Sequence, residues 1–308
     1  MVNKLIELGT GQRRRPTPGQ GVSARNLAGG ALPGALVMVT GGGSGIGRAT
    51  ALAFAEQGCR VVNVDINLAA AEQTAAACAA RVATNRVSPP ASLWKSSALS
   101  CDMGDWSSVA AVAERAEDEY GPVDVLVNNA GVGMTGRFLD TSMEDWRWIR
   151  SVNLDGVVHG CAAFGPAMVG RGAGQIVNVS SGLAYTPRAT EVAYVTTKAA
   201  VLALSQCLRA DWSPHGVGVT AICPGVINTP IVAATRYLGA QADAPVRERV
   251  ARLFRHGHPP EMVAEAIVDA VRRDPAVVPV GWEARLGWWG HRLLPLAVSQ
   301  LAARRELG

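Results

Sequence analysis

Three residues in the second half of the chain could transfer a proton together. Tyr194 and Lys198 stand four residues apart, about one helical turn, so their side chains point the same way. A phenol beside an ammonium loses its proton more easily, because the phenolate gains a nearby opposite charge. Ser181 ends an apolar run and could hold the substrate oxygen that the tyrosine protonates. The three residues predict acid–base chemistry near neutral pH.

A tyrosine and a lysine at this spacing occur in many helices by chance, so their meaning depends on a cofactor site elsewhere in the chain. The pattern Leu36-Val-Met-Val-Thr-Gly-Gly-Gly-Ser-Gly-Ile-Gly47 indicates one. An apolar strand leads into a glycine-rich turn, and a helix is predicted from about Gly45 to Gln57. Gly41 permits the turn, while Gly45 and Gly47 let the backbone approach a pyrophosphate and let the helix pack closely on the strand. The helix N-terminus then offers free N–H groups to the phosphates.

A carboxylate follows this turn at the spacing that ribose recognition requires. Asp65 ends a second strand-like run, residues 60–65, about 20 residues after the glycines. It could accept hydrogen bonds from the adenosine ribose, and its charge would repel a 2′-phosphate. No lysine or arginine stands among Gly42, Gly43 and Ser44 to attract one, so the sequence favours NAD over NADP. The alternative is a strand-end carboxylate that only caps a turn.

With these patterns in place, the chain resembles the short-chain dehydrogenase/reductase family, in its non-extended branch. The matching motifs keep the family's order over residues 35 to about 275. A narrower similarity is to a mycobacterial subgroup whose dehydrogenase domain is sometimes fused behind an epoxide hydrolase-like α/β-hydrolase. The motifs are Thr40-Gly-Gly-Gly-Ser-Gly-Ile-Gly47, Asn128-Asn-Ala-Gly131, Asn153, Ser181, Tyr194-x-x-x-Lys198 and Pro224-Gly-Val-Ile-Asn-Thr229.

The resemblance implies a role for each matching residue. Tyr194 would be the general acid in carbonyl reduction or the base in alcohol oxidation, Lys198 would lower its pKa, and Ser181 would bind the reacting oxygen. Asn153 would hold a water in the proton relay. The implied catalytic residues are thus Asn153, Ser181, Tyr194 and Lys198. The implied cofactor-binding residues are Gly41, Gly43, Ser44, Gly45, Ile46, Gly47, Asp65, Ile66, Asp102, Met103, Asn129, Ala130, Gly131, Tyr194, Lys198, Pro224, Gly225, Ile227 and Thr229.

Composition and element order agree with one α/β domain. The 308 residues are 48% hydrophobic and 18% charged, which suits a parallel sheet covered on both faces. Strand-like runs alternate with helical stretches, so we expect a Rossmann-type doubly wound parallel sheet of about seven strands in a single domain, residues 34–280. The expected strands are residues 36–40, 61–65, 98–102, 123–127, 175–180, 218–223 and 276–280.

The charge of the chain is concentrated at its start. Residues 1–33 carry five basic side chains and one acidic one, which accounts for the whole net charge of +4. We expect a poorly ordered basic tail there, and no nucleic-acid partner for the folded body. The six cysteines are scattered, which is typical of a reduced, cytoplasmic protein. His256 and His258 lack a third ligand at suitable spacing, so no metal site is predicted.

The C-terminal segment 281–308 is rich in tryptophan and is treated as an extension of the domain. Its stretch Gly281-Trp-Glu-Ala-Arg-Leu-Gly-Trp-Trp-Gly-His-Arg-Leu-Leu-Pro-Leu296 mixes three tryptophans with arginines. One interpretation is an interfacial helix that rests on a membrane surface. The favoured one is a segment that covers the substrate cleft or forms a subunit contact.

Residues 183–192 and 230–260 should decide the substrate, and their apolar side chains favour a hydrophobic alcohol or ketone. The family resemblance implies a homodimer or homotetramer. A non-catalytic NAD-binding scaffold or sensor is the competing function, but it does not explain why all four catalytic residue types are present. An epimerase or dehydratase of the extended branch is disfavoured by the glycine spacing and by the absence of a larger substrate domain.

Overall fold

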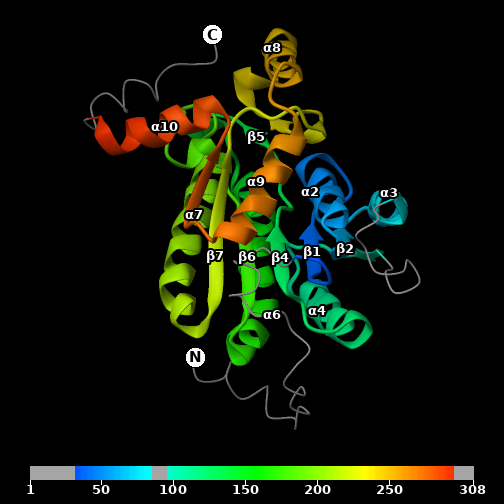
Figure 1. Cartoon of the computed structure of the whole chain (residues 1–308). Coiled ribbons are helices and arrows are strands. Elements are labelled where there is room, and N and C mark those ends of the chain that lie inside the picture. The colour runs from blue at the N-terminus through cyan, green and yellow to red at the C-terminus, as the bar shows by residue number, and fades with distance from the viewer. Residues whose placement is uncertain (1–31, 85–95, 295–308) are drawn as a thin grey trace.

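Seven parallel strands form the centre of the structure (Figure 1). The computed structural model describes residues 32–84 and 96–294. The strand order is β3-β2-β1-β4-β6-β7-β9, and each neighbouring pair is parallel. The predicted doubly wound sheet of seven strands is therefore confirmed. The strands are β1 (Leu36–Thr40), β2 (Arg60–Asp65), β3 (Ser97–Ser100), β4 (Val125–Asn128), β6 (Gly174–Val179), β7 (Val217–Pro224) and β9 (Val277–Val280).

Helices cover both faces of this sheet. Side chains alternate along β1, so Val37 and Val39 pack on one face while Leu36 and Met38 pack on the other. Both faces are apolar, which explains why the strands appear in the sequence as nearly continuous hydrophobic runs. The first face is covered by α2 (Gly45–Glu56), α3 (Leu68–Thr84) and α9 (Pro260–Arg273), and the second by α4 (Trp106–Tyr120), α6 (Gly156–Arg171) and α7 (Val192–Trp212).

The strand order reverses beside β1. This strand pairs with β2 on one side and with β4 on the other, so the chain continues from β1 to β2 in one direction and from β4 to β6 in the opposite direction. In open α/β sheets the crevice at such a point is where ligands bind. Shorter elements surround this end of the sheet, namely β5 (Met134–Thr135), β8 (Arg236–Tyr237), α8 (Ala244–Arg255) and α10 (Trp282–Leu293).

Some boundaries differ from the predictions. The expected strand at 123–127 begins two residues later, at Val125. Between Ser142 and Val158 the chain forms α5 (Met143–Arg150), then a π-helical segment, Ser151–Asp155, and then the start of α6. The π-helical hydrogen bonds place one extra residue in the turn that carries Asn153, and such insertions are frequent at functional sites. The basic tail lies outside the described residues, apart from its last two positions.

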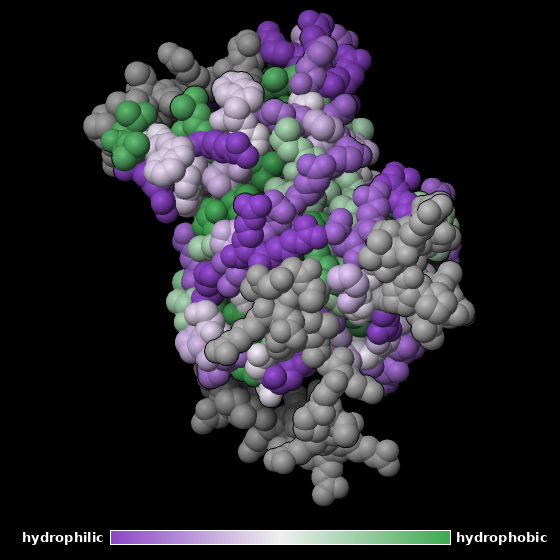
Figure 2. All heavy atoms as spheres, in the orientation of Figure 1, coloured by the Kyte–Doolittle hydropathy of each residue, from purple (hydrophilic) through white to green (hydrophobic). Residues whose placement is uncertain are grey.

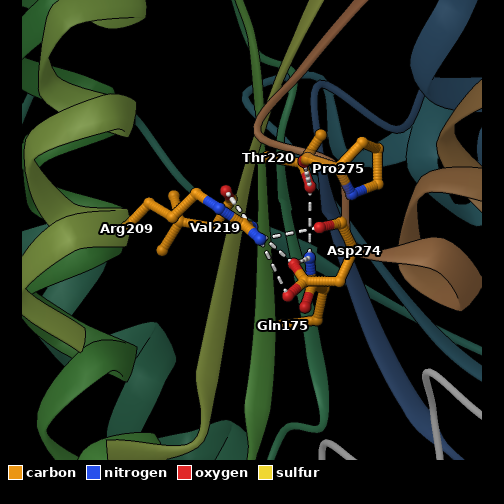
Figure 3. A network of polar contacts seen from close by, with 6 residues as sticks. All are labelled: Gln175, Arg209, Val219, Thr220, Asp274 and Pro275. Atoms are coloured by element: carbon orange, nitrogen blue, oxygen red, sulfur yellow. Dashed lines mark hydrogen bonds and ion pairs between the residues drawn. The ribbon is translucent and has the colours of Figure 1, made fainter. Parts of the chain in front are cut away.

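A polar network joins the amino ends of three strands (Figure 3). The guanidinium of Arg209, on α7, donates to the Asp274 carboxylate at 2.7 and 3.1 Å, to its carbonyl at 2.7 Å and to the Val219 carbonyl at 3.1 Å. Gln175 donates to the same carboxylate at 3.1 Å, and Thr220 donates to the Pro275 carbonyl at 2.7 Å. Asp274 itself has a left-handed backbone with φ of 48°. The network connects α7 to the end of α9 across the sheet edge.

The surface around α10 is the least polar part of the view in Figure 2, where green and white side chains gather at the end of the molecule that carries this helix. Its exposed apolar side chains are Trp282, Leu286, Trp289 and Leu293. In the parts of the chain that the structure describes, no helix is both long and apolar enough to cross a membrane.

Candidate active site

The glycine-rich turn after β1 is held by the loop after β4. The Thr40 hydroxyl accepts hydrogen bonds from the backbone N–H groups of Asn129 and Ala130, at 3.0 and 3.1 Å. The Asn129 amide donates to the carbonyls of Thr40 and Gly41, at 2.9 and 3.2 Å. Gly41 has φ of 63°, a conformation that glycine adopts without steric cost. A Cβ at Gly47 would collide with the Gly41 carbonyl, so helix α2 can start this close to the turn only with glycine there.

Asp65 closes the same turn from β2. Its carboxylate accepts from the backbone N–H of Gly43 at 2.9 Å and from that of Asn67 at 2.9 Å. The carboxylate therefore caps a turn, which was the alternative interpretation of this residue. It also lines a cavity beside the glycine-rich turn, so the structure leaves the predicted contact with a ribose possible. The two interpretations are compatible, since a carboxylate has about four acceptor positions.

This cavity lies at the carboxyl ends of the strands and has a volume of about 430 Å³. Most of the residues predicted to bind the cofactor line it. Gly43 and Gly47 do not, because they face Asp65 and Gly41 and shape the turn from behind. The predicted residues that line it are Gly41, Ser44, Gly45, Ile46, Asp65, Ile66, Asp102, Met103, Asn129, Ala130, Gly131, Tyr194, Lys198, Pro224, Gly225, Ile227 and Thr229.

The predicted catalytic residues come from three elements that meet at one end of this cavity. Ser181 follows β6, while Tyr194 and Lys198 lie in the first two turns of α7. The Lys198 ammonium donates to the Val179 carbonyl at 3.0 Å and lies 5.9 Å from the centre of the Tyr194 ring. Asn153 comes from the π-helical segment and is fully buried. The structure thus brings together the residues that the sequence motifs indicate.

The Asn153 amide bonds to backbone in this structure. Its Oδ1 accepts from the N–H of Val132 at 2.8 Å, and its Nδ2 donates to the carbonyl of the same residue at 2.9 Å. The second N–H points to the Thr197 hydroxyl at 3.5 Å. One lone pair of Oδ1 remains for a water, so the predicted relay role stays a prediction. The visible role is to hold the loop after β4 against α7.

Burial changes the pKa values of the acid–base pair in a direction that the sequence did not predict. Burial raises the pKa of Tyr194 to about 12; the Ser181 side chain lowers it, and the charge of Glu191 raises it. Burial also lowers the pKa of Lys198 to about 8. The predicted lowering of the Tyr194 pKa by Lys198 is therefore not seen in the protein alone, where loss of solvent dominates.

A second cavity, of about 480 Å³, adjoins the first. Ser181 and Tyr194 line both cavities, whereas Lys198 lines only the first. The walls of the second are mostly apolar. They come from β5, from the loop after Ser181, from the segment before and within α8, and from α10 and the residue after it. The apolar lining residues include Met134, Leu183, Tyr185, Pro187, Ile231, Val232, Tyr237, Val250, Leu253, Phe254, Trp282, Leu286 and Leu294.

Helix α10 forms one wall of this second cavity. The Tyr185 hydroxyl donates to the Ala284 carbonyl at 2.9 Å, and its ring contacts Trp288 edge to face at a centroid distance of 5.2 Å. The Glu283 carboxylate accepts from the Val226 N–H at 2.7 Å and contacts the His258 ring at 3.1 Å. These contacts support the interpretation that the Trp-rich segment covers the cleft. His258, considered from the sequence as a metal ligand together with His256, bonds to this carboxylate.

Sequence reasoning missed two carboxylates that line the second cavity, Glu191 and Glu283. Glu191 could have been found, because it lies three residues before Tyr194 and so on the same helical face. No local signal indicates Glu283, whose partner Val226 is 57 residues away.

A family profile described as "short chain dehydrogenase" matches residues 35–237. The chain belongs to the short-chain dehydrogenase family. The family assignment made from the motifs is thus confirmed, and with it the assignment as an oxidoreductase. The match includes the glycine-rich turn and the catalytic residues, and it ends at β8.

Two relatives and one solved structure place the chain within the short-chain dehydrogenases. It is 45% identical over 278 residues to a probable oxidoreductase, EphD, of Mycobacterium tuberculosis, covering 88% of this chain and 45% of that protein. It therefore spans less than half of that relative's length. It is 35% identical to a D-threitol dehydrogenase of Mycolicibacterium smegmatis, over 77% of this chain and 85% of that one.

The solved structure is a short-chain dehydrogenase/reductase from Burkholderia phymatum in complex with NAD. It superposes with a TM-score of 0.73 at 26% identity, covering 90% of this chain and 98% of that one.

Proposed function

We propose that this short-chain dehydrogenase transfers a hydride between NAD and a hydrophobic secondary alcohol or its ketone, with Tyr194 as the general acid and base. The observation that carries the proposal is that Ser181 and Tyr194 line both cavities. A dinucleotide in the first cavity and an alcohol in the second would meet at these two hydroxyls, where a proton must move to or from the substrate oxygen.

The residues of the first cavity fit a dinucleotide. Gly41 and Gly45 present backbone without side chains where α2 begins, and the Asp65 carboxylate stands at the far end of the turn. When bound, the nicotinamide supplies or accepts the hydride at the substrate carbon. Tyr194 then gives a proton to the carbonyl oxygen, or takes one from the alcohol, while the Ser181 hydroxyl bonds to that oxygen and orients it. Lys198 stabilises the phenolate by its charge.

The preference for NAD rests on Asp65, because a 2′-phosphate placed near its carboxylate would be repelled. The preference for a hydrophobic substrate rests on the apolar walls of the second cavity. The D-threitol dehydrogenase relative is named for a small polyol, which makes polyols the substrates to compare with.

Turnover measurements test this proposal. Purified protein is incubated with NAD or NADP and a panel of secondary alcohols of increasing apolar size, with threitol and galactitol as polar comparators, and the absorbance of reduced nicotinamide is followed. We expect turnover with NAD and larger kcat/KM for apolar alcohols. Faster oxidation of the polyols would contradict the hydrophobic substrate, and no turnover of any alcohol or ketone would contradict the catalytic role.

Two further proposals concern the setting of the enzyme. All six cysteines have free thiols, and five of them are buried, which agrees with a reduced cytoplasmic location. The family resemblance supports a homodimer or homotetramer, which light scattering of the purified chain would measure.

A further inference from the structure

Glu191 is a carboxylate on the wall of the apolar cavity. It lies at the N-terminal end of α7, three residues before Tyr194, and lines the second cavity together with it. Within the described residues, no hydrogen bond or ion pair to its side chain is found. The other carboxylate of this cavity, Glu283, is bound by Val226 and His258. The two carboxylates that line this cavity thus differ, because protein groups form hydrogen bonds to Glu283 but not, within the described residues, to Glu191.

The backbone on both sides holds Glu191 in place. Its N–H donates to the Arg188 carbonyl at 3.3 Å, and its own carbonyl accepts from the Val195 N–H at 2.8 Å. The residue also forms a parallel bridge with Gly136. Glu191 is the N-cap residue of α7, and its side chain makes no capping hydrogen bond to the first turn of the helix. The backbone of Glu191 is therefore fixed, while its carboxylate remains able to bond to a molecule in the cavity.

Electrostatic effects agree with this position. Burial raises the pKa of the Glu191 carboxyl, and Arg188, which also lines the cavity, lowers it. The Glu191 charge in turn raises the pKa of both Tyr194 and Tyr237. The carboxylate is thus within electrostatic range of Tyr194 and of a second phenol, Tyr237, that lines the same cavity. Glu191 is half-buried, and a carboxylate that is held partly away from solvent without a hydrogen-bond donor is costly, so a ligand that supplies a donor is favoured.

We propose that Glu191 is a specificity-determining residue that accepts a hydrogen bond from a second hydroxyl group of the substrate, close to the hydroxyl that Tyr194 deprotonates. This rests on the proposed function and narrows its substrate class. The substrate is an apolar molecule that carries a vicinal diol or, in the oxidised form, a hydroxyketone. Glu191 binds the hydroxyl that does not react, and the walls of α8 and α10 contact the apolar body.

Three probes that share one six-membered ring test the assignment: cyclohexanol, trans-cyclohexane-1,2-diol and trans-2-aminocyclohexanol. The full chain is assayed with NAD, beside the variants Glu191→Ala, Glu191→Gln and Glu72→Gln. Glu72 is an exposed carboxylate on α3 that lines neither cavity, so its variant is the matched control. The readout is the ratio of kcat/KM for diol and for cyclohexanol, which cancels general losses of activity.

We expect the wild type and Glu72→Gln to favour the diol by about 10- to 100-fold, the range for a hydrogen bond to a charged group. Glu191→Ala should bring the ratio close to one, and Glu191→Gln should keep part of it, because an amide oxygen still accepts. A wild-type ratio near one, or a ratio that survives in Glu191→Ala, would overturn the proposal. So would an aminoalcohol preferred over the diol and lost in Glu191→Gln, because Glu191 would then bind a cation.

A binding measurement separates this inference from the proposed function. Trp282 lines the cavity, so tryptophan fluorescence can report the Kd of each probe in the presence of NADH or NAD. If no probe is turned over, hydride transfer to this class fails, while the ratio of Kd values for cyclohexanol and the diol still decides the role of Glu191. A Kd ratio of at least about tenfold that is lost in Glu191→Ala supports it, and equal values overturn it.

Discussion

The ammonium of Lys198 lies 5.9 Å from the centre of the Tyr194 ring and donates its hydrogen bond to the Val179 carbonyl at the end of β6. The lysine is thus fixed by the sheet beside the ring of the phenol. Without a bound dinucleotide, burial is the largest influence on the pKa of both groups. It raises the pKa of Tyr194 to about 12 and lowers that of Lys198 to about 8. Charge stabilisation of the phenolate must therefore compete with a large desolvation cost.

Replacement of Tyr194 by phenylalanine should remove catalysis while leaving the fold intact. We expect kcat to fall by about 10²- to 10⁴-fold, the usual contribution of a positioned acid or base, and the Kd for NADH to change by less than about tenfold. Tyr120→Phe, at the end of α4 outside both cavities, is the matched control. Activity retained in Tyr194→Phe would favour the scaffold or sensor function.

Replacement of Lys198 by methionine should stabilise the protein while abolishing activity. Its folded pKa of about 8 lies below the ordinary lysine value, so the folded state disfavours the charge. The unfolded chain then binds more protons between about pH 8 and 10.5, and the wild type gains stability as pH rises through that window. At pH 7 we expect the free energy of unfolding of the variant to exceed that of the wild type by about 1–3 kcal/mol.

Urea unfolding at several pH values, without added dinucleotide, measures this difference. The buried cysteines also titrate above pH 8, and with the opposite sign, because burial raises their pKa. Cys59 and Cys161 contribute equally to both proteins and cancel in the difference between variant and wild type. Cys223 interacts with Lys198, so its change is part of that difference. That difference should be constant below pH 8 and shrink toward pH 10.5. A difference that grows with pH would contradict the lowered lysine pKa.

Replacement of Asp65 should change the choice of cofactor. Asp65→Asn keeps an oxygen for the Gly43 N–H, which the native carboxylate accepts at 2.9 Å, but removes the charge that repels a 2′-phosphate. We expect the ratio of kcat/KM for NAD and for NADP to fall by about 10- to 100-fold. Asp65→Ala loses the turn bond as well and should also lower stability. An unchanged ratio in Asp65→Asn would mean that Asp65 only caps the turn.

The Arg209 network should affect stability and not catalysis, because it lies at the amino ends of the strands, opposite the site. Arg209→Ala leaves the partly buried Asp274 carboxylate without its guanidinium, and we expect a loss of about 2–3 kcal/mol in the free energy of unfolding. Arg209→Lys keeps the charge but not the forked geometry and should recover part of it. A change in kcat/KM beyond about twofold at temperatures where the variants are folded would contradict a purely structural role.

The outer face of α10 tests the membrane interpretation. Trp289 and Leu293 are 58% and 75% exposed, so a double change to glutamate alters the surface while the cavity wall remains. We expect neither the wild type nor the Trp289→Glu, Leu293→Glu variant to float with anionic vesicles in a density gradient. Flotation of the wild type alone would establish an interfacial helix.

The amino-acid sequence by itself determined the sheet and most of the site. Strands buried on both faces must be continuous apolar runs, so β1, β2, β6 and β7 could be predicted to within a residue or two. Glycines that must adopt left-handed backbone, such as Gly41, and a tyrosine and lysine one helical turn apart are local features, and local features appear directly in the order of residues.

Only the tertiary structure decided which side chains are satisfied and which are not. Glu191 and Glu283 are the same residue type in one cavity, but a backbone N–H 57 positions away bonds to Glu283. The side chain of Asn153, in the π-helical turn, bonds to Val132, and Tyr185 bonds to Ala284 of the cavity wall, 99 positions away. The direction of the Tyr194 pKa shift likewise follows from burial, which arises from packing between distant segments and has no local signature.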